Sequence, residues 1–211
     1  TAQALVLDNR NRFNVVCCGR RWGKSTLAWM LSAESASLSH IFGYACPTAE
    51  DYGKRWYEAE EYLRPIIRPG GVRISDGIFE FRGKSRMEWF GLWRYDGVRG
   101  NKYHRFIIDE AAHSTNLEPA WTQAIRATLT DYIGDGYFLS TPNGDNYFKQ
   151  LFDRNSGLWR SWQMPTSSNR FIDADEIEAA RLDMPSVIYE QEYLAQFISL
   201  QGARVKREWL Q

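Results

Sequence analysis

The chain alternates short apolar runs with longer segments whose apolar residues recur every three to four positions. The apolar runs predict buried strands at residues 13–18, 41–46, 106–108, 137–139 and 160–164. The longer segments predict helices at residues 25–39, 49–63, 119–129, 147–152, 173–182 and 186–196. Short apolar strands that alternate with helices are typical of a parallel sheet covered by helices on both faces. We therefore expect an α/β fold with a central, mostly parallel sheet.

Two shorter patterns complete this outline. Residues 73–90 alternate apolar and polar positions around Gly77 and Gly83, which predicts strands joined by turns. Residues 96–102 form a glycine-containing loop, and Asp173 precedes a helix with Glu176 three residues on, a capping pattern.

The sequence has no internal repeat and no low-complexity linker. Its 211 residues suffice for one large α/β domain or two small ones.

Composition narrows the class of protein but not its function. Hydrophobic residues make up 44% of the chain, which excludes wholesale disorder. The formal net charge is zero, so binding to nucleic acid would need a local basic face. One loose basic group contains acidic residues too, and a solvated strand face explains it equally well. Its members are Arg82, Lys84, Arg86, Arg94, Lys102 and Arg105.

The sequence carries no secretion or membrane signal. It has no signal peptide and no apolar run of about twenty residues. Cys17, Cys18 and Cys46 lack metal-ligand spacing, so we expect buried, reduced thiols in a cytosolic protein. Because the sequence begins at Thr1 without an initiator Met, we expect it to be a processed or excised fragment.

A phosphate-binding loop is the clearest chemical signal. Gly23, Lys24 and Ser25 fit the end of the pattern G-x-x-x-x-G-K-[ST], between a predicted strand and a predicted helix. The backbone N–H groups of such a loop bind phosphate oxygens, the lysine adds a cation, and the hydroxyl can ligate Mg²⁺. The first position of the pattern is Cys18 instead of glycine. We expect Gly19 to supply the unusual backbone geometry in its place.

Two carboxylates follow the strand at 106–108. In P-loop enzymes the first, here Asp109, holds the shell of Mg²⁺, and the second, here Glu110, acts on the attacking water. His113 lies nearby, and we expect it to be structural. The strand at 137–139 ends in Ser140, Thr141 and Pro142, whose hydroxyls would reach the same edge of the sheet.

One arginine lies between glycines shortly before the acidic strand. Arg99 in the run Asp96-Gly97-Val98-Arg99-Gly100 can be interpreted as a residue inserted into a neighbour's active site or as an ordinary turn residue. The sequence favours neither interpretation.

Together these segments resemble the ATPase domain of the large terminase, the DNA-packaging motor subunit of tailed bacteriophages. They follow the order of that family over nearly the whole chain, and the Gly-Arg-Arg form of the phosphate loop is its most specific part. The segments are residues 19–26, 96–100, 107–112, 140–144 and 189–197.

The resemblance implies a P-loop fold of the additional-strand type and Mg²⁺-dependent hydrolysis of ATP. It further implies translocation of double-stranded DNA by a homo-oligomeric ring on the portal protein, with a small terminase subunit as partner, in the host cell cytoplasm. Large terminases also carry a nuclease domain with an acidic two-metal cluster. No such cluster occurs in this sequence, so we expect residues 1–211 to be a single ATPase domain without nuclease activity.

The resemblance also implies roles for individual residues. Asp109 and Ser25 would hold Mg²⁺, and Glu110 would be the catalytic carboxylate. Arg20 would act on the subunit's own nucleotide and Arg99 on the neighbour's. Ser140, Thr141 and Pro142 would couple hydrolysis to movement. The nucleotide-binding residues would be Gly19, Arg20, Arg21, Trp22, Gly23, Lys24, Ser25 and Thr26, with Gln3 as an adenine contact.

Two other functions fit parts of the same pattern. A helicase or remodelling ATPase would share the Asp-Glu-Ala run, although the chain has no second P-loop core to close on the first. A nucleotide-dependent assembly module that binds ATP with little turnover would suit the many aromatic residues.

Overall fold

The computed structural model describes residues 1–198 and contains one continuous eight-stranded sheet. The strands lie in the order β3-β4-β5-β2-β6-β7-β1-β8. All pairs from β5 to β8 are parallel, and the β3–β4 and β4–β5 pairs are antiparallel. The strands are β1 (Phe13–Cys18), β2 (Ile41–Cys46), β3 (Ile67–Arg73), β4 (Ile78–Phe81), β5 (Arg86–Gly91), β6 (Arg105–Asp109), β7 (Asp135–Ser140) and β8 (Trp159–Met164).

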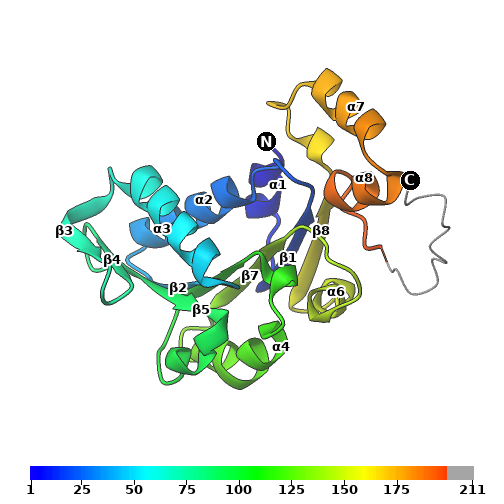
Figure 1. The fold of residues 1–211 in the computed structure, drawn as a ribbon. Coiled ribbons are helices and arrows are strands. Elements are labelled where there is room, and N and C mark those ends of the chain that lie inside the picture. The colour runs from blue at the N-terminus through cyan, green and yellow to red at the C-terminus, as the bar shows by residue number, and fades with distance from the viewer. Residues whose placement is uncertain (199–211) are drawn as a thin grey trace.

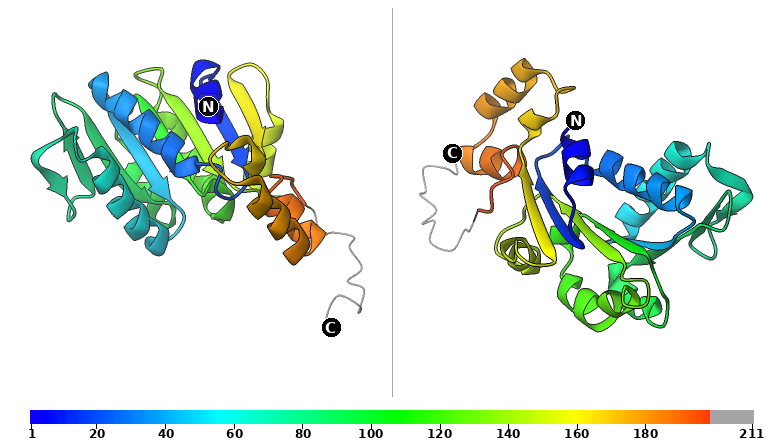
Figure 2. Two further views of the ribbon diagram at one scale, coloured as in Figure 1. Left: turned by 90° about the horizontal axis from the view of Figure 1, so that it is seen from above. Right: turned by 180° about the vertical axis from the view of Figure 1, so that it is seen from behind.

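Helices cover both faces of the sheet (Figure 1). One face carries α1 (Ala2–Asp8), α2 (Lys24–Ser37) and α3 (Ala49–Leu63). The other carries α4 (Leu117–Ala120), a π-helical turn at Trp121–Ile125, α5 (Arg126–Thr128) and α6 (Tyr147–Asp153). The helices α7 (Ala174–Asp183) and α8 (Ser186–Glu192) lie beyond β8, at the end of the sheet opposite the β3–β4 hairpin (Figure 2).

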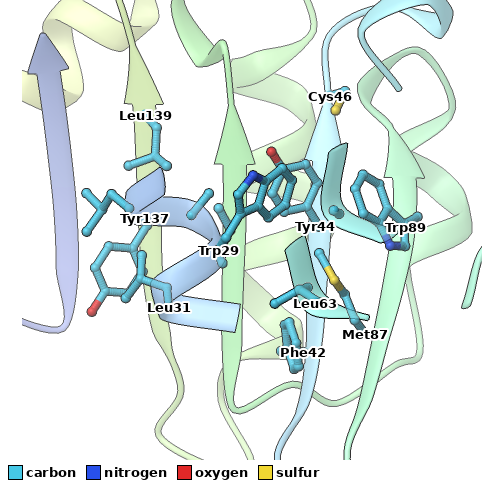
Figure 3. Close-up of a cluster of buried hydrophobic side chains, with 14 of the residues drawn as sticks. Trp29, Leu31, Phe42, Tyr44, Cys46, Leu63, Met87, Trp89, Tyr137 and Leu139 are labelled. Carbon is cyan, nitrogen blue, oxygen red and sulfur yellow. The ribbon is translucent and has the colours of Figure 1, made fainter. Parts of the chain in front are cut away.

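Each face has its own buried hydrophobic cluster. Under α2 and α3, large aromatic side chains fill the space above the middle of the sheet (Figure 3). The Trp29 ring stacks on Tyr44 with centroids 5.3 Å apart, and Tyr44 lies 4.5 Å from Trp89. Because aromatic rings bury a large apolar area each, this packing fixes α2 and α3 firmly on the sheet.

The expected fold class is confirmed, and so are most of the expected elements. The strands at 13–18 and 41–46 and the helix at 49–63 have the predicted bounds. Asp173 caps α7 as predicted, although its carboxylate accepts a hydrogen bond from the Asp175 N–H, at 2.9 Å. The three cysteines are buried free thiols.

Other elements differ from the expectations. The last helix ends at Glu192 instead of residue 196, and the helix α1 was not predicted. The segment expected as one helix at 119–129 starts earlier and contains the π turn. A 3₁₀ helix at Leu92–Val98 occupies the start of the expected loop at 96–102. Within residues 1–198, no helix is long and apolar enough to span a membrane.

Candidate functional site

The carboxyl ends of β1, β6 and β7 meet at one edge of the sheet, and a cleft of about 910 Å³ opens there. This is where parallel α/β sheets usually bind ligands. Residues 20–26 form one wall, and Glu110 and Thr141 follow β6 and β7 into the same space. A face of α3 that includes Arg55 closes the opposite side. The fold thus brings three segments that lie far apart in the sequence to one cleft.

The phosphate loop owes its shape to three residues. A Cβ atom at Gly19 would lie 2.4 Å from the hydroxyl oxygen of Thr166 and 2.6 Å from the carbonyl of Tyr193. Gly19 is therefore required for close packing and not, as expected from the sequence, for an unusual backbone angle. The left-handed angles fall on Arg21, with φ of 62°, and on Gly23, with φ of 104°. Cys18 belongs to β1 and is fully buried, which explains why the usual first glycine is dispensable here.

Three successive carbonyl groups of this loop bond to side chains behind it. The Arg20 carbonyl accepts from the Thr166 hydroxyl at 2.8 Å, and the Arg21 carbonyl accepts from the Asn169 amide at 2.8 Å. The Trp22 carbonyl accepts from the Gln3 amide at 2.8 Å.

Gln3 thus contacts the back of the loop, and the residues that line the cleft do not include it. The indole N–H of Trp22, itself buried, donates to the Ser168 hydroxyl at 2.8 Å. Side chains from other parts of the chain thus hold the loop in place. The helix α2 begins at Lys24, directly after the loop, so the N-terminal end of α2 faces the cleft.

Asp109 is almost completely buried at the end of β6, with 1% of its side chain exposed. Its Oδ2 atom accepts a hydrogen bond from the Tyr44 hydroxyl at 3.0 Å and another from Arg55 Nε at 2.6 Å. Its Oδ1 atom is buried with no hydrogen-bond partner among the described residues. Buried carboxylate oxygens normally have partners, so the unpaired atom indicates a place for a further cation or donor.

Glu110 follows in a strained backbone conformation, with φ of 48° and ψ of 40°. Its Oε1 atom lies 3.8 Å from Lys24 Nζ and 3.4 Å from Arg55 Nη2. Its Oε2 atom is also buried without a hydrogen bond among the described residues, 4.0 Å from Nε2 of the half-exposed His113. Burial raises the pKa of the Glu110 carboxyl, Lys24 counteracts this, and Asp109 adds to it.

These groups suit a magnesium ion better than a metal held by protein ligands alone. The described residues contain no cluster of three or more His, Cys, Asp or Glu side chains that could hold a metal. Mg²⁺ usually takes one or two protein oxygens and completes its shell with waters and substrate phosphates. Asp109 with its free Oδ1 and the cleft residue Ser25 supply that kind of partial shell.

The two candidate arginines lie in different places. Arg20 lines the cleft, but its exposed side chain turns to Glu192 at the end of α8, and its backbone N–H donates to the Glu192 carbonyl at 2.7 Å. Arg99 follows the 3₁₀ helix on an exposed loop, where it pairs with Asp96 at 2.9 Å. The residues that line the cleft do not include Arg99, so the structure does not bring the two arginines together.

The segment after β7 contacts the turn that follows Glu110. The Ala112 N–H donates to the Ser140 hydroxyl at 3.1 Å. Asn146 donates from its side-chain amide to the Ala112 carbonyl at 2.8 Å. Thr141 lines the cleft next to this contact, and Pro142 is buried beside it. The turn after Glu110 and the segment after β7 are therefore joined by direct hydrogen bonds.

Tyr44 and Arg55 were missed by the sequence analysis although both contact Asp109. One signal was available for Arg55. Because α3 follows β2 at the same edge of the sheet, charged residues that recur every three to four positions from its N-terminal end would face the site. Asp51, Lys54, Arg55 and Glu58 do so.

Comparison with known proteins identifies relatives along most of the chain. No family model matches the sequence. The terminase large subunit of Escherichia phage T5 is 28% identical over 207 residues, which cover 92% of this chain and 46% of that protein. The terminase large subunit of Thermus phage G20c is also 28% identical, over 88% of this chain and 46% of its own length. The chain thus spans about half the length of these curated relatives.

Solved structures show the same fold. The large terminase ATPase domain of Thermus phage P74-26 has a TM-score of 0.72 at 21% identity and covers 94% of this chain and 93% of its own. The large terminase of another thermophilic bacteriophage, in complex with ADP, has a TM-score of 0.75 at 15% identity. It covers 92% of this chain and 50% of its own. The resemblance indicated by the motifs is therefore confirmed: the chain is similar in sequence to phage terminase large subunits and shares the fold of their ATPase domains.

Proposed function

We propose that this chain hydrolyses ATP with Mg²⁺ and that hydrolysis powers the translocation of double-stranded DNA into a viral procapsid. The observation that carries the proposal is the cleft that joins the phosphate loop to the acidic pair on a large-terminase fold. The thermophilic phage enzyme was solved with ADP and also with ATP-γ-S, which supports nucleotide binding at such a fold.

The arrangement assigns a role to each cleft residue. The backbone of residues 19–23, together with Lys24 and Thr26, would bind the phosphates at the N-terminus of α2. Ser25 and Asp109 would hold Mg²⁺, which would neutralise charge on the phosphates. Glu110 would orient the attacking water for in-line displacement and accept its proton.

The remaining motifs have roles outside the nucleotide itself. Arg20 would turn from Glu192 towards the phosphates of its own subunit, and Arg99 would reach a neighbouring subunit from its exposed loop. Ser140, Thr141 and Pro142 would couple hydrolysis to movement through the contact between Ser140 and Ala112. Gln3 would act on nucleotide binding through the carbonyl of Trp22.

At a larger scale, we propose that residues 1–211 form the single ATPase domain of a motor subunit. Such subunits would assemble as a ring on the portal protein in the host cell cytoplasm, with the small terminase subunit as a further partner. The similarity to terminase large subunits supports this setting.

Substitution of the proposed catalytic carboxylate tests the chemistry. Glu110→Gln keeps the size of the side chain but removes the base, so hydrolysis should fall by roughly 10² to 10⁴-fold. Binding of a non-hydrolysable ATP analogue should remain. Glu118→Gln, at an exposed position before the π turn, is the matched control and should retain full turnover.

Two outcomes would contradict the proposal. Equal turnover by wild type and Glu110→Gln at saturating ATP would remove Glu110 from the catalytic step. Tight ATP binding by the wild type without turnover, even with DNA and the portal present, would favour an assembly module over a motor.

A further inference from the structure

Arg55 already binds the carboxylate that the proposed Mg²⁺ would need, through Oδ2 and not through the unpaired Oδ1. Its guanidinium lies among three carboxylates, with Nε 2.6 Å from Asp109 Oδ2, Nη1 2.8 Å from Glu58 Oε2 and Nη2 3.4 Å from Glu110 Oε1. Only 14% of the side chain is exposed. Burial alone would lower the pKa of Arg55, but Asp109, with smaller contributions from Tyr44 and Glu58, more than offsets it, so the guanidinium stays charged.

Two positive charges already lie beside the acidic pair before any nucleotide binds. Lys24 and Arg55 supply two positive charges, and Asp109 and Glu110 supply two negative charges, with the closest pairs between 2.6 and 3.8 Å apart. A divalent cation at Asp109 would add positive charge next to a buried guanidinium, where low dielectric makes the repulsion strong. Mg²⁺ and Arg55 therefore compete for the same carboxylate.

We propose that Arg55 is the resident counter-ion of Asp109 in the nucleotide-free protein and is exchanged for Mg²⁺ when Mg²⁺–nucleotide binds. This inference rests on the proposed binding of Mg²⁺ and ATP at the cleft. Arg55 is in this sense a positioning residue: it holds the Asp109 carboxylate in place until the metal binds.

The structure provides what such an exchange requires. Glu58 lies one turn along α3 from Arg55 and already pairs with it, and 38% of the Glu58 side chain is exposed beside the cleft that it lines. The guanidinium can therefore leave Asp109 without losing all of its partners. The Tyr44 hydroxyl would still hold Asp109 Oδ2 after the exchange.

The exchange makes the affinity for Mg²⁺ depend on Arg55. If Asp109 is mostly paired with Arg55, the apparent affinity for the metal falls in proportion to the fraction of protein in which Asp109 is free. A variant without the guanidinium has Asp109 free at all times. It should therefore need less Mg²⁺ to bind nucleotide.

Titration of Mg²⁺ against a fluorescent, non-hydrolysable ATP analogue tests this, starting from EDTA. Arg55→Gln should lower the Mg²⁺ concentration for half-maximal binding by roughly three- to tenfold. Its binding in EDTA should stay within about twofold of wild type. Arg64→Gln, at the exposed end of the same helix, is the control and should match wild type in both conditions.

A second variant keeps the test decisive if Arg55→Gln is poorly folded. Arg55→Lys retains the charge but lacks the planar guanidinium that bonds to several carboxylates at once. The Mg²⁺ concentration for half-maximal binding should therefore lie between those of wild type and Arg55→Gln. A folded variant with an unchanged Mg²⁺ requirement overturns the exchange. So does equal weakening with and without Mg²⁺, which would make Arg55 a phosphate ligand.

The same titration separates the two proposals. A wild-type protein that binds no analogue at any Mg²⁺ concentration contradicts the proposed ATPase function itself. A wild type that needs Mg²⁺, beside an Arg55→Gln variant with the same requirement, contradicts only the exchange.

Discussion

Two buried arginines lie at opposite ends of the strands of the same sheet and have different roles. Arg55 faces the cleft at the carboxyl ends of the strands, whereas Arg105 begins β6 at their amino ends. Both are charged groups with little exposure, 14% for the Arg55 side chain and 4% for Arg105. Both pair with carboxylates from neighbouring elements. Burial and ion pairing alone therefore do not distinguish a binding site from a structural brace.

The difference lies in what remains unpaired around each. Arg105 forms two parallel bonds to Asp135, at 2.8 and 2.7 Å, and donates from Nη1 to Glu34, Ser35 and the Leu31 carbonyl. Its three guanidinium nitrogens thus all have acceptors. Around Arg55, Asp109 Oδ1 and Glu110 Oε2 are buried without partners in the described part of the chain. Unpaired, buried carboxylate atoms beside a cleft distinguish this candidate site from the fully paired cluster around Arg105.

This contrast also corrects the view of the basic residues. Arg105 belonged to the loose basic group considered for contact with DNA, and its burial among Glu34 and Asp135 rules it out for that purpose. The guanidinium instead ties α2 to β6 and β7 at the edge of the sheet far from the cleft.

The largest effect should follow from removal of Arg105. Arg105→Leu leaves Asp135 without its main partner and Glu34 with Arg10 alone. Breaking a buried ion pair costs about 3–5 kcal/mol; because both carboxylates are partly exposed, we expect the lower end, about 3 kcal/mol. The free energy of unfolding, measured by urea denaturation, should fall by that amount. The Mg²⁺ requirement of the folded fraction should not change, because the ion pairs lie away from the cleft.

The exposed Arg64 provides the control for this measurement. Arg64→Leu should change the free energy of unfolding by less than about 0.5 kcal/mol. If Arg105→Leu were equally mild, the cluster of Arg105, Glu34 and Asp135 at the amino ends of the strands (the amino-edge cluster) would not stabilise the fold. Arg105 would then not be a structural counterpart to Arg55.

A pair of tyrosines allows a finer test, since each edge has one beside its carboxylate. The Tyr44 hydroxyl lies 3.0 Å from Asp109 Oδ2, whereas the Tyr137 hydroxyl lies 3.5 Å from Asp135 Oδ2. A hydrogen bond to a charged group is worth about 1.5–3 kcal/mol, and one at the longer distance is much weaker. Tyr44→Phe should therefore lower the free energy of unfolding by about 1.5–3 kcal/mol, and Tyr137→Phe by less than about 0.5 kcal/mol.

The free energy of unfolding of both variants is measured by thermal or chemical denaturation, first without and then with Mg²⁺ and nucleotide. Equal losses for both would show that the Tyr44 contact does not position Asp109. Mg²⁺ and nucleotide should stabilise wild type and both variants by binding to the folded state, but the deficit of Tyr44→Phe relative to wild type should persist, because the Tyr44 hydroxyl would still hold Asp109 Oδ2 after the exchange.

The sequence predicted the fold class and the segments at the cleft, because apolar periodicity and the phosphate loop are local signals. Side-chain contacts between elements far apart in the sequence could not be predicted. The role of Gly19 depends on Thr166 and Tyr193, which approach it only in the folded chain. Arg55 was missed because α3 carries many charges: their spacing marks one face of the helix, but only the folded chain shows which residue on that face contacts Asp109. The π turn at Trp121–Ile125 has no sequence signature that separates it from an ordinary helix.

The smallest predicted effect concerns acid and the amino-edge cluster. Burial alone would raise the pKa of the Glu34 carboxyl, but hydrogen bonds from Arg10 and Arg105 more than offset this and hold the pKa below its usual value. An acid with a lowered pKa in the folded state adds stability above its unfolded pKa, about 4.3. That stability is lost as pH falls through the lower, folded value.

Glu34→Gln removes this contribution, so the unfolding free energy of the variant should depend less on pH than that of wild type below about pH 4.3. A third of the Glu34 side chain is exposed, and solvent screening limits the difference to no more than about 1 kcal/mol. Urea denaturation of both proteins across that range measures it, with Glu118→Gln as the exposed control. Identical acid dependence in all three would mean that the Glu34 carboxylate adds nothing to the bonds that Arg105 forms with Asp135, Ser35 and the Leu31 carbonyl.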